Sequence, residues 1–167
     1  MSWFKTFLAC LCLTAGLAGC GFEPLYAAKG VAATYPAIEI SNIPDRDGQF
    51  LRNKLIDRLY TAGRPVDAPY ELRFSPLVKD IVDFGIRKNA AATRAQIQIS
   101  TQMQLIEKSS GKILLQRDLR ANGAHDLLDN QLATLVSQQT TVETILQALG
   151  DDAVTALNLY FRRQALP

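Results

Sequence analysis

The sequence has little of the chemistry from which most active sites are built. Its 167 residues include one histidine, His125, one tryptophan and three cysteines. A zinc site of the usual kind draws on several Cys and His ligands, and one histidine cannot supply them. The chain also lacks a Gly-x-Ser-x-Gly turn and a glycine-rich phosphate loop. We therefore expect no metal site and no enzymatic activity.

Only one neighbouring pair, His125-Asp126, could act as a base and the group that orients it. We interpret it as part of a solvated loop, which is the commoner setting for such a pair. The sequence also contains two pairs of closely spaced carboxylates. We interpret Asp45 with Asp47 as turn and cap residues, and Asp151 with Asp152 as a helix surface.

A strong charge of either sign is absent as well. Lys and Arg number 18 against 16 Asp and Glu, which gives a formal net charge of +2. A general polyanion-binding surface would need a larger excess of cations. We expect no nucleic-acid partner, although a local basic patch remains open.

The amino-terminal segment is typical of a secretory signal. Lys5 precedes an apolar run over residues 7–13, and the segment ends in Leu17-Ala18-Gly19-Cys20. A permanent membrane helix needs about 20 apolar residues, so we expect residues 1–19 to be removed. The ending resembles the lipobox of bacterial lipoproteins. That resemblance implies a diacylglyceryl thioether and an N-acyl chain on Cys20, which together form a stable membrane anchor. We expect no other cofactor.

Removal of the signal would leave 148 residues (167 − 19) and a single cysteine, Cys20. Without a second thiol the mature chain can form no internal disulfide, so its stability must come from packing. Residues 20–37 contain Gly21, Pro24, Gly30 and Pro36 and are expected to form an extended tether. Residues 38–167 are long enough for one domain with its own core.

Periodicity predicts the elements of that domain. A short strand is expected over 38–43, and a helix of about four turns follows, with Asp47 as its N-cap. Alternation over 70–84 indicates a long strand with a bulge or bend near Pro76. The clearest strand covers 95–105, where apolar residues alternate with Gln96, Gln98, Ser100, Gln102 and Gln104. A turn at 109–112 leads to a strand over 113–121.

Apolar residues at helical spacing from about Asn130 to Arg163 predict a carboxy-terminal helix. Gly150 would weaken its middle, or the stretch 137–141 would interrupt it, and the sequence leaves both possibilities open. The fold class is therefore α+β: a two-layer sandwich in which two helices cover one face of a four-stranded, mainly antiparallel sheet, in the order β-α-β-β-β-α.

One basic segment remains as a candidate binding site. Arg87, Lys88 and Arg94 lie between two long strands. Such cations can bind phosphate groups through charge-assisted hydrogen bonds. The alternative interpretation is a solvated hairpin whose charges serve solubility, and composition alone favours it.

Three stretches resemble the lipopolysaccharide-assembly lipoproteins of the LptE type, in particular their shorter forms. The first is Cys20-Gly21-Phe22-Glu23-Pro24-Leu25-Tyr26-Ala27, the specific one. The second, residues 47–53, opens the first predicted helix, and the third, residues 157–161, lies near the end. The resemblance spans nearly the whole mature chain and implies the same α+β sandwich.

The resemblance also implies a function. Such lipoproteins plug an LptD-type outer-membrane β-barrel, assist its folding and help deliver lipopolysaccharide to the outer leaflet. We therefore expect an anchored protein on the periplasmic face of the outer membrane, with that barrel and lipopolysaccharide as partners. Arg87, Lys88 and Arg94 become candidates for the phosphates of lipopolysaccharide. The alternative is an accessory lipoprotein of another lipid-transport or barrel-insertion complex that binds protein only.

Overall fold

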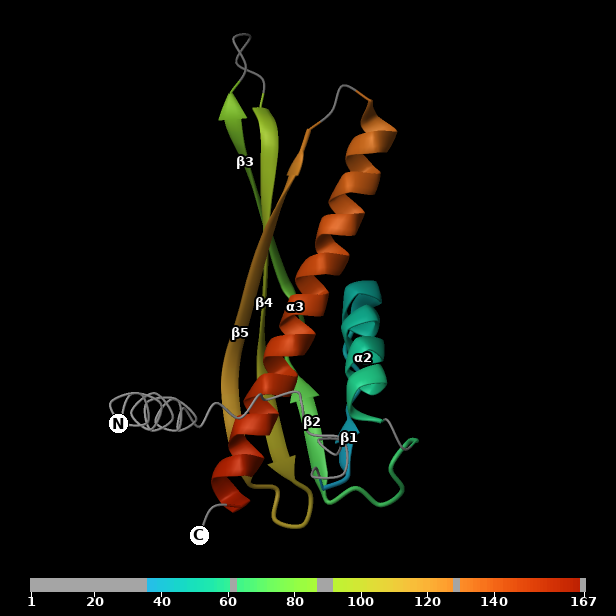
Figure 1. Cartoon of the computed structure of the whole chain (residues 1–167), viewed down its shortest axis with the longest axis vertical. Coiled ribbons are helices and arrows are strands. Elements are labelled where there is room, and N and C mark those ends of the chain that lie inside the picture. Colours follow the sequence, from blue (N-terminus) through green and yellow to red (C-terminus); the bar gives the residue numbers. More distant parts are fainter. Residues whose placement is uncertain (1–35, 61–62, 87–91, 128–129, 166–167) are drawn as a thin grey trace, which may run out of the picture. The chain divides into compact units, whose positions relative to one another are not determined.

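Five strands and two helices make up the part of the chain that the structure describes. The computed structural model describes residues 36–60, 63–86, 92–127 and 130–165, and all of them fall within one compact unit, Thr34–Pro167. Figure 1 shows the elements, which follow in the order β1 (Ile38–Ile40), α2 (Asp45–Leu59), β2 (Tyr70–Phe74), β3 (Val78–Ile86), β4 (Ala92–Glu107), β5 (Ile113–Asp126) and α3 (Gln131–Ala165). The predicted α+β class is confirmed.

The sheet is built around β4, its longest strand. β5 is antiparallel to β4 along one side, while β2 and β3 follow each other along the other side, both antiparallel. The short β1 is parallel to β2, with Ile38 opposite Tyr70. The sheet is therefore mainly antiparallel, as predicted, and its one parallel pair is at the β1 edge.

The predicted count of four strands is wrong, because residues 70–84 form two strands rather than one. Pro76 has no N–H to donate, so the ladder with β4 cannot continue through it. At the break, Ser75 provides the hydrogen bonds to β4. Its Oγ accepts a hydrogen bond of 2.9 Å from the Gln102 N–H, and its carbonyl accepts one of 2.8 Å from the Thr101 hydroxyl. The bend expected near Pro76 is therefore present, and it divides one long strand into β2 and β3.

The core lies between the sheet and the helices. The alternation predicted for 95–105 is confirmed, because every odd-numbered residue in this range is buried. These six residues are Ala95, Ile97, Ile99, Thr101, Met103 and Leu105. Leu72 and Phe74 of β2 stand opposite Leu105 and Met103, and so face the same side. Leu51 and Leu55 of α2 join this core, as do Leu146, Leu149 and Leu157 of α3.

α3 is one continuous helix of 35 residues, which settles the question that its sequence left open. Asn130 caps it, because its side-chain oxygen accepts a hydrogen bond of 2.9 Å from the Leu132 N–H. The polar stretch stays helical. The Thr140 and Thr141 hydroxyls donate to the carbonyls of Val136 and Ser137, four residues earlier, at 3.0 and 2.9 Å.

The cap predicted for the first helix is wrong. α2 begins at Asp45, two residues before the predicted N-cap, and it follows Pro44, which provides no side-chain cap. Asp45 and Asp47 both lie in the first turn, where the helix dipole favours negative charge. Asp47 instead forms an ion pair of 2.5 Å with Lys79 of β3, and so ties the start of α2 to the sheet.

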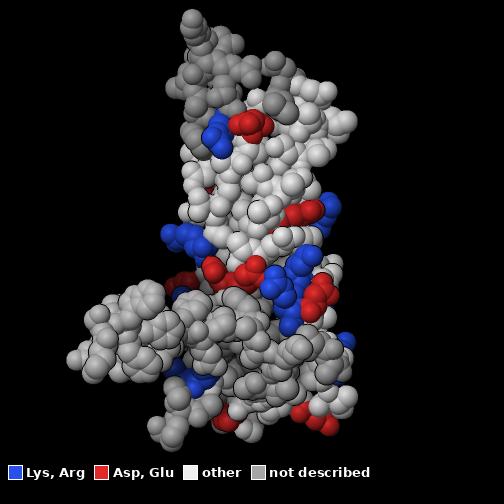
Figure 2. All heavy atoms as spheres, in the orientation of Figure 1, with Lys and Arg blue, Asp and Glu red and all other residues white. Residues whose placement is uncertain are grey.

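The two helices differ in length. α2 has 15 residues and α3 has 35, so α2 runs beside only part of α3 (Figure 1). No residue of α3 from Gln131 to Thr141 is buried, and Leu132, Leu135 and Val136 are all more than half exposed. Figure 2 shows that this part of the surface is almost free of charged side chains. None of the described helices is both long enough and apolar enough to cross a bilayer.

Candidate interaction surface

The outer face of β4 is polar and uncharged along most of its length. Because side chains alternate across a strand, the buried odd-numbered residues leave the even-numbered ones on the face away from the helices. They are Gln96, Gln98, Ser100, Gln102 and Gln104. We call these five residues the glutamine face. All five are half-buried rather than fully exposed, because neighbouring strands flank them.

Side-chain hydrogen bonds link the glutamine face to β5. The amide of Gln102 donates to Asp118 at 2.9 Å, and the amide of Gln104 donates to Gln116 at 3.2 Å. Gln104 also donates to Gln102 at 3.2 Å along the same strand. These bonds hold the amides in a fixed array, which presents both donors and acceptors without net charge.

A shallow hollow of about 440 Å³ opens on the same face at the break between β2 and β3. It lies beside the interruption at Pro76, where neither β2 nor β3 pairs with β4 between Ser100 and Met103. Its lining combines hydroxyl, amide, carboxylate and guanidinium groups: Ser75, Ser100, Gln102, Asp118 and Arg120, with Val78 at its edge. The hollow suits hydrogen bonding to a polar surface.

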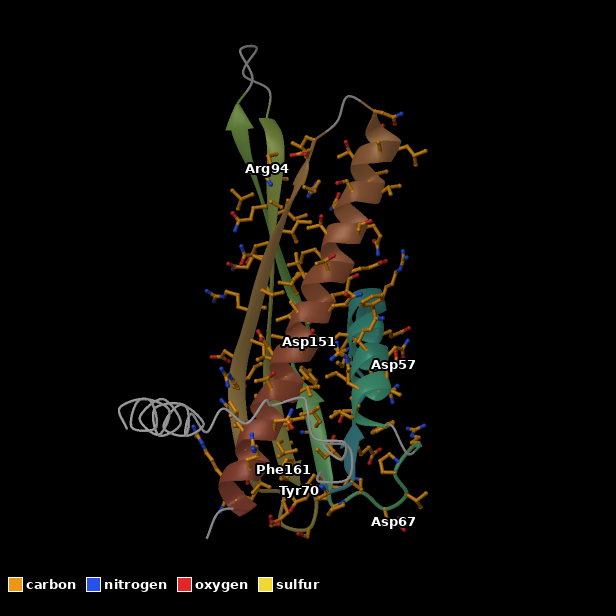
Figure 3. The ribbon with its side chains drawn as sticks, viewed as in Figure 1. Asp57, Asp67, Tyr70, Arg94, Asp151 and Phe161 are labelled. Carbon is orange, nitrogen blue, oxygen red and sulfur yellow. The ribbon has the colours of Figure 1, made fainter. Side chains whose placement is uncertain are left out.

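Of the three predicted phosphate-binding residues, the structure describes one. Arg87 and Lys88 lie outside the described residues. Arg94 is exposed near the start of β4, and its Nε lies 3.8 Å from the Asp126 carboxylate of β5. Figure 3 shows Arg94 at the end of the sheet opposite to Tyr70 and Phe161. Its charge is therefore partly compensated, although exposed pairs of this kind are weak.

The interpretation of His125 as a solvated loop residue is wrong. β5 continues to Asp126, and His125 stands opposite Ala95 on the inner face, only 5% exposed. Its Nδ1 has no hydrogen-bond partner among the described residues. Asp126 points to the opposite face, because neighbouring strand residues alternate. The two side chains cannot form a base with its orienting group, and this geometry removes the catalytic interpretation.

The carboxylate of Asp151 forms an ion pair between the two helices. Asp151 of α3 lies 2.7 Å from Arg58 of α2, and both side chains are about half exposed. A cleft of about 190 Å³ lies beside this pair, and Asp57 also lines it. Figure 3 labels Asp57 and Asp151 on the two helices. This agrees with the helix-surface interpretation of Asp151. Within the described ranges no group of three or more His, Cys, Asp or Glu side chains could hold a metal ion.

One carboxylate has a perturbed pKa. The Ser41 hydroxyl donates a hydrogen bond of 2.5 Å to Glu71, and Arg73 lies 3.0 Å from the same carboxylate. The hydrogen bond and the cation lower the pKa of Glu71 below its ordinary value of 4.5, against a smaller opposing effect of burial. This group joins β2 to the residue after β1 and serves the fold.

Cys20, the predicted lipidation site, lies outside the described residues. Sequence reasoning found the glutamine face and Arg94. It missed Asp126 as the partner of Arg94, because strand register decides that pairing. It also missed the hollow, because the gap beside Pro76 depends on where β3 resumes.

No protein-family model matches the chain, and no curated protein matches its sequence. Solved structures do match its fold. A candidate lipoprotein from Caulobacter crescentus CB15 is 21% identical, with a TM-score of 0.63 over 80% of this chain and 96% of that one. The minor lipoprotein from Acinetobacter baumannii is 15% identical, with a TM-score of 0.59 over 75% and 92%.

The rare lipoprotein B from Shewanella oneidensis is also similar, at 12% identity and a TM-score of 0.52 over 74% of this chain and 96% of that one. At these identities the likeness concerns the fold. The α+β sandwich of this chain is therefore one that several bacterial lipoproteins share.

Proposed function

We propose that the chain is a non-enzymatic outer-membrane lipoprotein that plugs an LptD-type β-barrel and helps deliver lipopolysaccharide to the outer leaflet. The observation that carries this proposal is the glutamine face, a row of uncharged and hydrogen-bonded side chains that no described helix covers. The lumen of outer-membrane barrels is polar, so such a face suits contact with the hydrated inner surface of a barrel. The shared fold of bacterial lipoproteins and the expected anchor at Cys20 support the same function.

The barrel contact is tested by an affinity pull-down from detergent-solubilised envelopes. The wild-type chain should recover a large outer-membrane barrel. Gln96→Arg with Gln98→Arg places two charges on the glutamine face and should reduce recovery at least tenfold, about 1.4 kcal/mol. Gln49→Arg with Gln147→Arg is the matched control, because both residues are exposed on the helices.

A wild-type chain that recovers no barrel would contradict the proposal. Recovery of different partners would instead favour the accessory lipoprotein of another lipid-transport or barrel-insertion complex. Equal loss in the control pair would show that added charge alone disturbs the complex, and the glutamine face would then lose its assigned role.

For lipopolysaccharide, the proposal assigns phosphate binding to Arg87, Lys88 and Arg94. Changing all three to serine should weaken binding of lipopolysaccharide to the purified chain, since charge-assisted hydrogen bonds would be lost. The control changes Arg46, Arg117 and Arg120 to serine, which removes the same charge from exposed positions elsewhere. Unchanged binding in the first variant would remove the assignment.

A further inference from the structure

One end of the sandwich gathers the start of the described chain and the end of α3. Tyr70 at the start of β2 makes an edge-to-face ring contact with Phe161 of α3, with centroids 5.8 Å apart (Figure 3). Ile38, the first residue of β1, stands opposite Tyr70, which in turn stands opposite Glu107 at the end of β4. We call this the Tyr70 end, and it includes the turn between β4 and β5 and the connection from α2 to β2.

The Tyr70 end exposes apolar side chains from three separate segments. Val66 of the α2–β2 connection is 85% exposed, Ile113 after the β4–β5 turn is 46% exposed, and Leu159 of α3 is 41% exposed. Tyr160 and Phe161 lie beside them as half-buried aromatic residues. Aromatic and aliphatic side chains in this combination are typical of surfaces that enter the headgroup region of a bilayer.

Cations lie close in the sequence to each of these apolar residues. The described side chains at this end include five cations, Arg64, Lys108, Lys112, Arg162 and Arg163, against three carboxylates, Glu39, Asp67 and Glu107, an excess of 5 − 3 = 2. Lys108 forms an ion pair with Glu39. Arg73 and Glu71 form a second ion pair, which adds no net charge to this end. Long cationic side chains can place their stems along apolar surface and their charges among lipid phosphates.

The described residues at the opposite end lack this combination. Leu132, Leu135 and Val136 are exposed there too, but residues 131–141 contain no charged side chain. Arg94 at that end has the Asp126 carboxylate as its neighbour. Among the described residues, exposed apolar side chains and a cationic excess coincide at the Tyr70 end.

The chain also enters the domain at this end. Residues 20–35 connect Cys20 to Pro36, two residues before Ile38. A lipid anchored through this segment keeps the nearest face of the domain at high effective concentration beside the bilayer, so even a weak patch is occupied.

We propose that the Tyr70 end is a membrane-contact surface that lies on the anionic phospholipid leaflet in which the acyl chains of Cys20 are inserted. The contact orients the sandwich, with Arg94 and the start of α3 directed away from that leaflet. It rests on the lipid anchor of the proposed function and is independent of the barrel contact.

The sequence offers a clean reporter for this contact. Trp3 is the chain's one tryptophan and falls within the segment expected to be removed, so an introduced tryptophan would be unique in the mature lipidated chain. Val66→Trp and Ile113→Trp report on the Tyr70 end. Val82→Trp and Leu132→Trp are matched controls, at residues 62% and 69% exposed elsewhere.

The lipidated variants are reconstituted in vesicles of phosphatidylglycerol and brominated phosphatidylcholine. Interfacial side chains lie about 5–10 Å into the headgroup boundary, so fluorescence at positions 66 and 113 should fall by roughly half relative to vesicles without bromine. Fluorescence at positions 82 and 132 should change little. Equal quenching at both ends, or none at position 113, would overturn the proposal.

Charge reversal tests the electrostatic part. Lys112→Glu with Arg163→Glu in the Ile113→Trp chain should abolish most of the quenching, whereas Arg46→Glu with Arg120→Glu should leave it. Quenching that survives the first pair would overturn the proposal. Mass analysis of the amino terminus comes first, because an unacylated chain would overturn anchor and contact together, whereas loss of barrel recovery alone would affect only the plug.

Discussion

Gly123 of β5 lies directly beneath Thr141 of α3, so close that a Cβ atom on this glycine would stand 2.8 Å from the Thr141 Cγ2 atom. The same Cβ would lie 3.2 Å from two side-chain atoms of Ile145. No real pair of carbon atoms remains at the shorter distance. The absence of a side chain at position 123 therefore sets how closely the long helix approaches the sheet.

Replacing Gly123 with valine should push α3 away from β5. Overpacking of this kind typically costs about 1–3 kcal/mol, measured as the free energy of unfolding in urea. Ala124→Val is the control, because Ala124 is the next residue and is exposed on the opposite face. Thr141→Ala should restore part of the loss in the Gly123→Val chain, and an undiminished loss would argue against this contact.

Ser75→Ala should destabilise the break between β2 and β3. The Ser75 Oγ accepts the hydrogen bond of the Gln102 N–H, and Pro76 cannot replace it. Loss of one such bond costs about 1 kcal/mol, again read from urea unfolding. Ser109→Ala, in the exposed turn after β4, should have little effect. Equal stability of the two variants would show that Ser75 does not support the ladder.

Glu71 should contribute to the pH dependence of stability. Its pKa in the folded chain lies below the ordinary value of 4.5, so the charged carboxylate stabilises the fold above that pH. This contribution disappears as the pH falls through the lowered value. The difference in unfolding free energy between wild type and Glu71→Gln should therefore shrink as the pH falls below 4.5.

Ser41→Ala provides the matched test, because it removes the hydrogen bond that lowers the pKa of Glu71 most. The variant should lose the contribution of Glu71 at a higher pH than wild type does. A wild-type difference that grows on acidification would contradict the assigned direction.

Asp126→Asn should strengthen binding of lipopolysaccharide if Arg94 contacts its phosphates. The carboxylate of Asp126 lies beside the Arg94 guanidinium and competes with an incoming anion. Exposed ion pairs are worth about 0.2–1 kcal/mol, so the gain in affinity is at most about fivefold and should decrease with added salt. Asp152→Asn removes the same charge from an exposed helix position and serves as control. Weaker binding by Asp126→Asn would count against Arg94 as a phosphate ligand.

The fold class and the core strand could be predicted because they depend on local pattern. β4 alternates from Ala95 to Leu105, so burial of one face was visible residue by residue. α3 was predicted between nearly correct bounds. The continuity of α3 was not predicted, because the hydrogen bonds from the Thr140 and Thr141 hydroxyls to helix carbonyls cannot be recognised from the spacing of apolar residues.

The errors concern features that distant partners decide. β5 was predicted to end at Ala121, but pairing with β4 carries it to Asp126 through Asn122 and Gly123, both poor strand formers. His125 was misinterpreted for the same reason, since its burial depends on that extension. Division of the long strand required knowledge that the Ser75 hydroxyl would replace the bond that Pro76 cannot make.

The unequal lengths of α2 and α3 have a dynamic consequence. The first 11 residues of α3, about three turns, bury no side chain fully, whereas the turns after Val142 are fixed in the core. The free energy needed to open a backbone amide should therefore rise along this single helix from its start toward its end. Amide hydrogens in its first turns should therefore exchange with solvent faster than those after Val142.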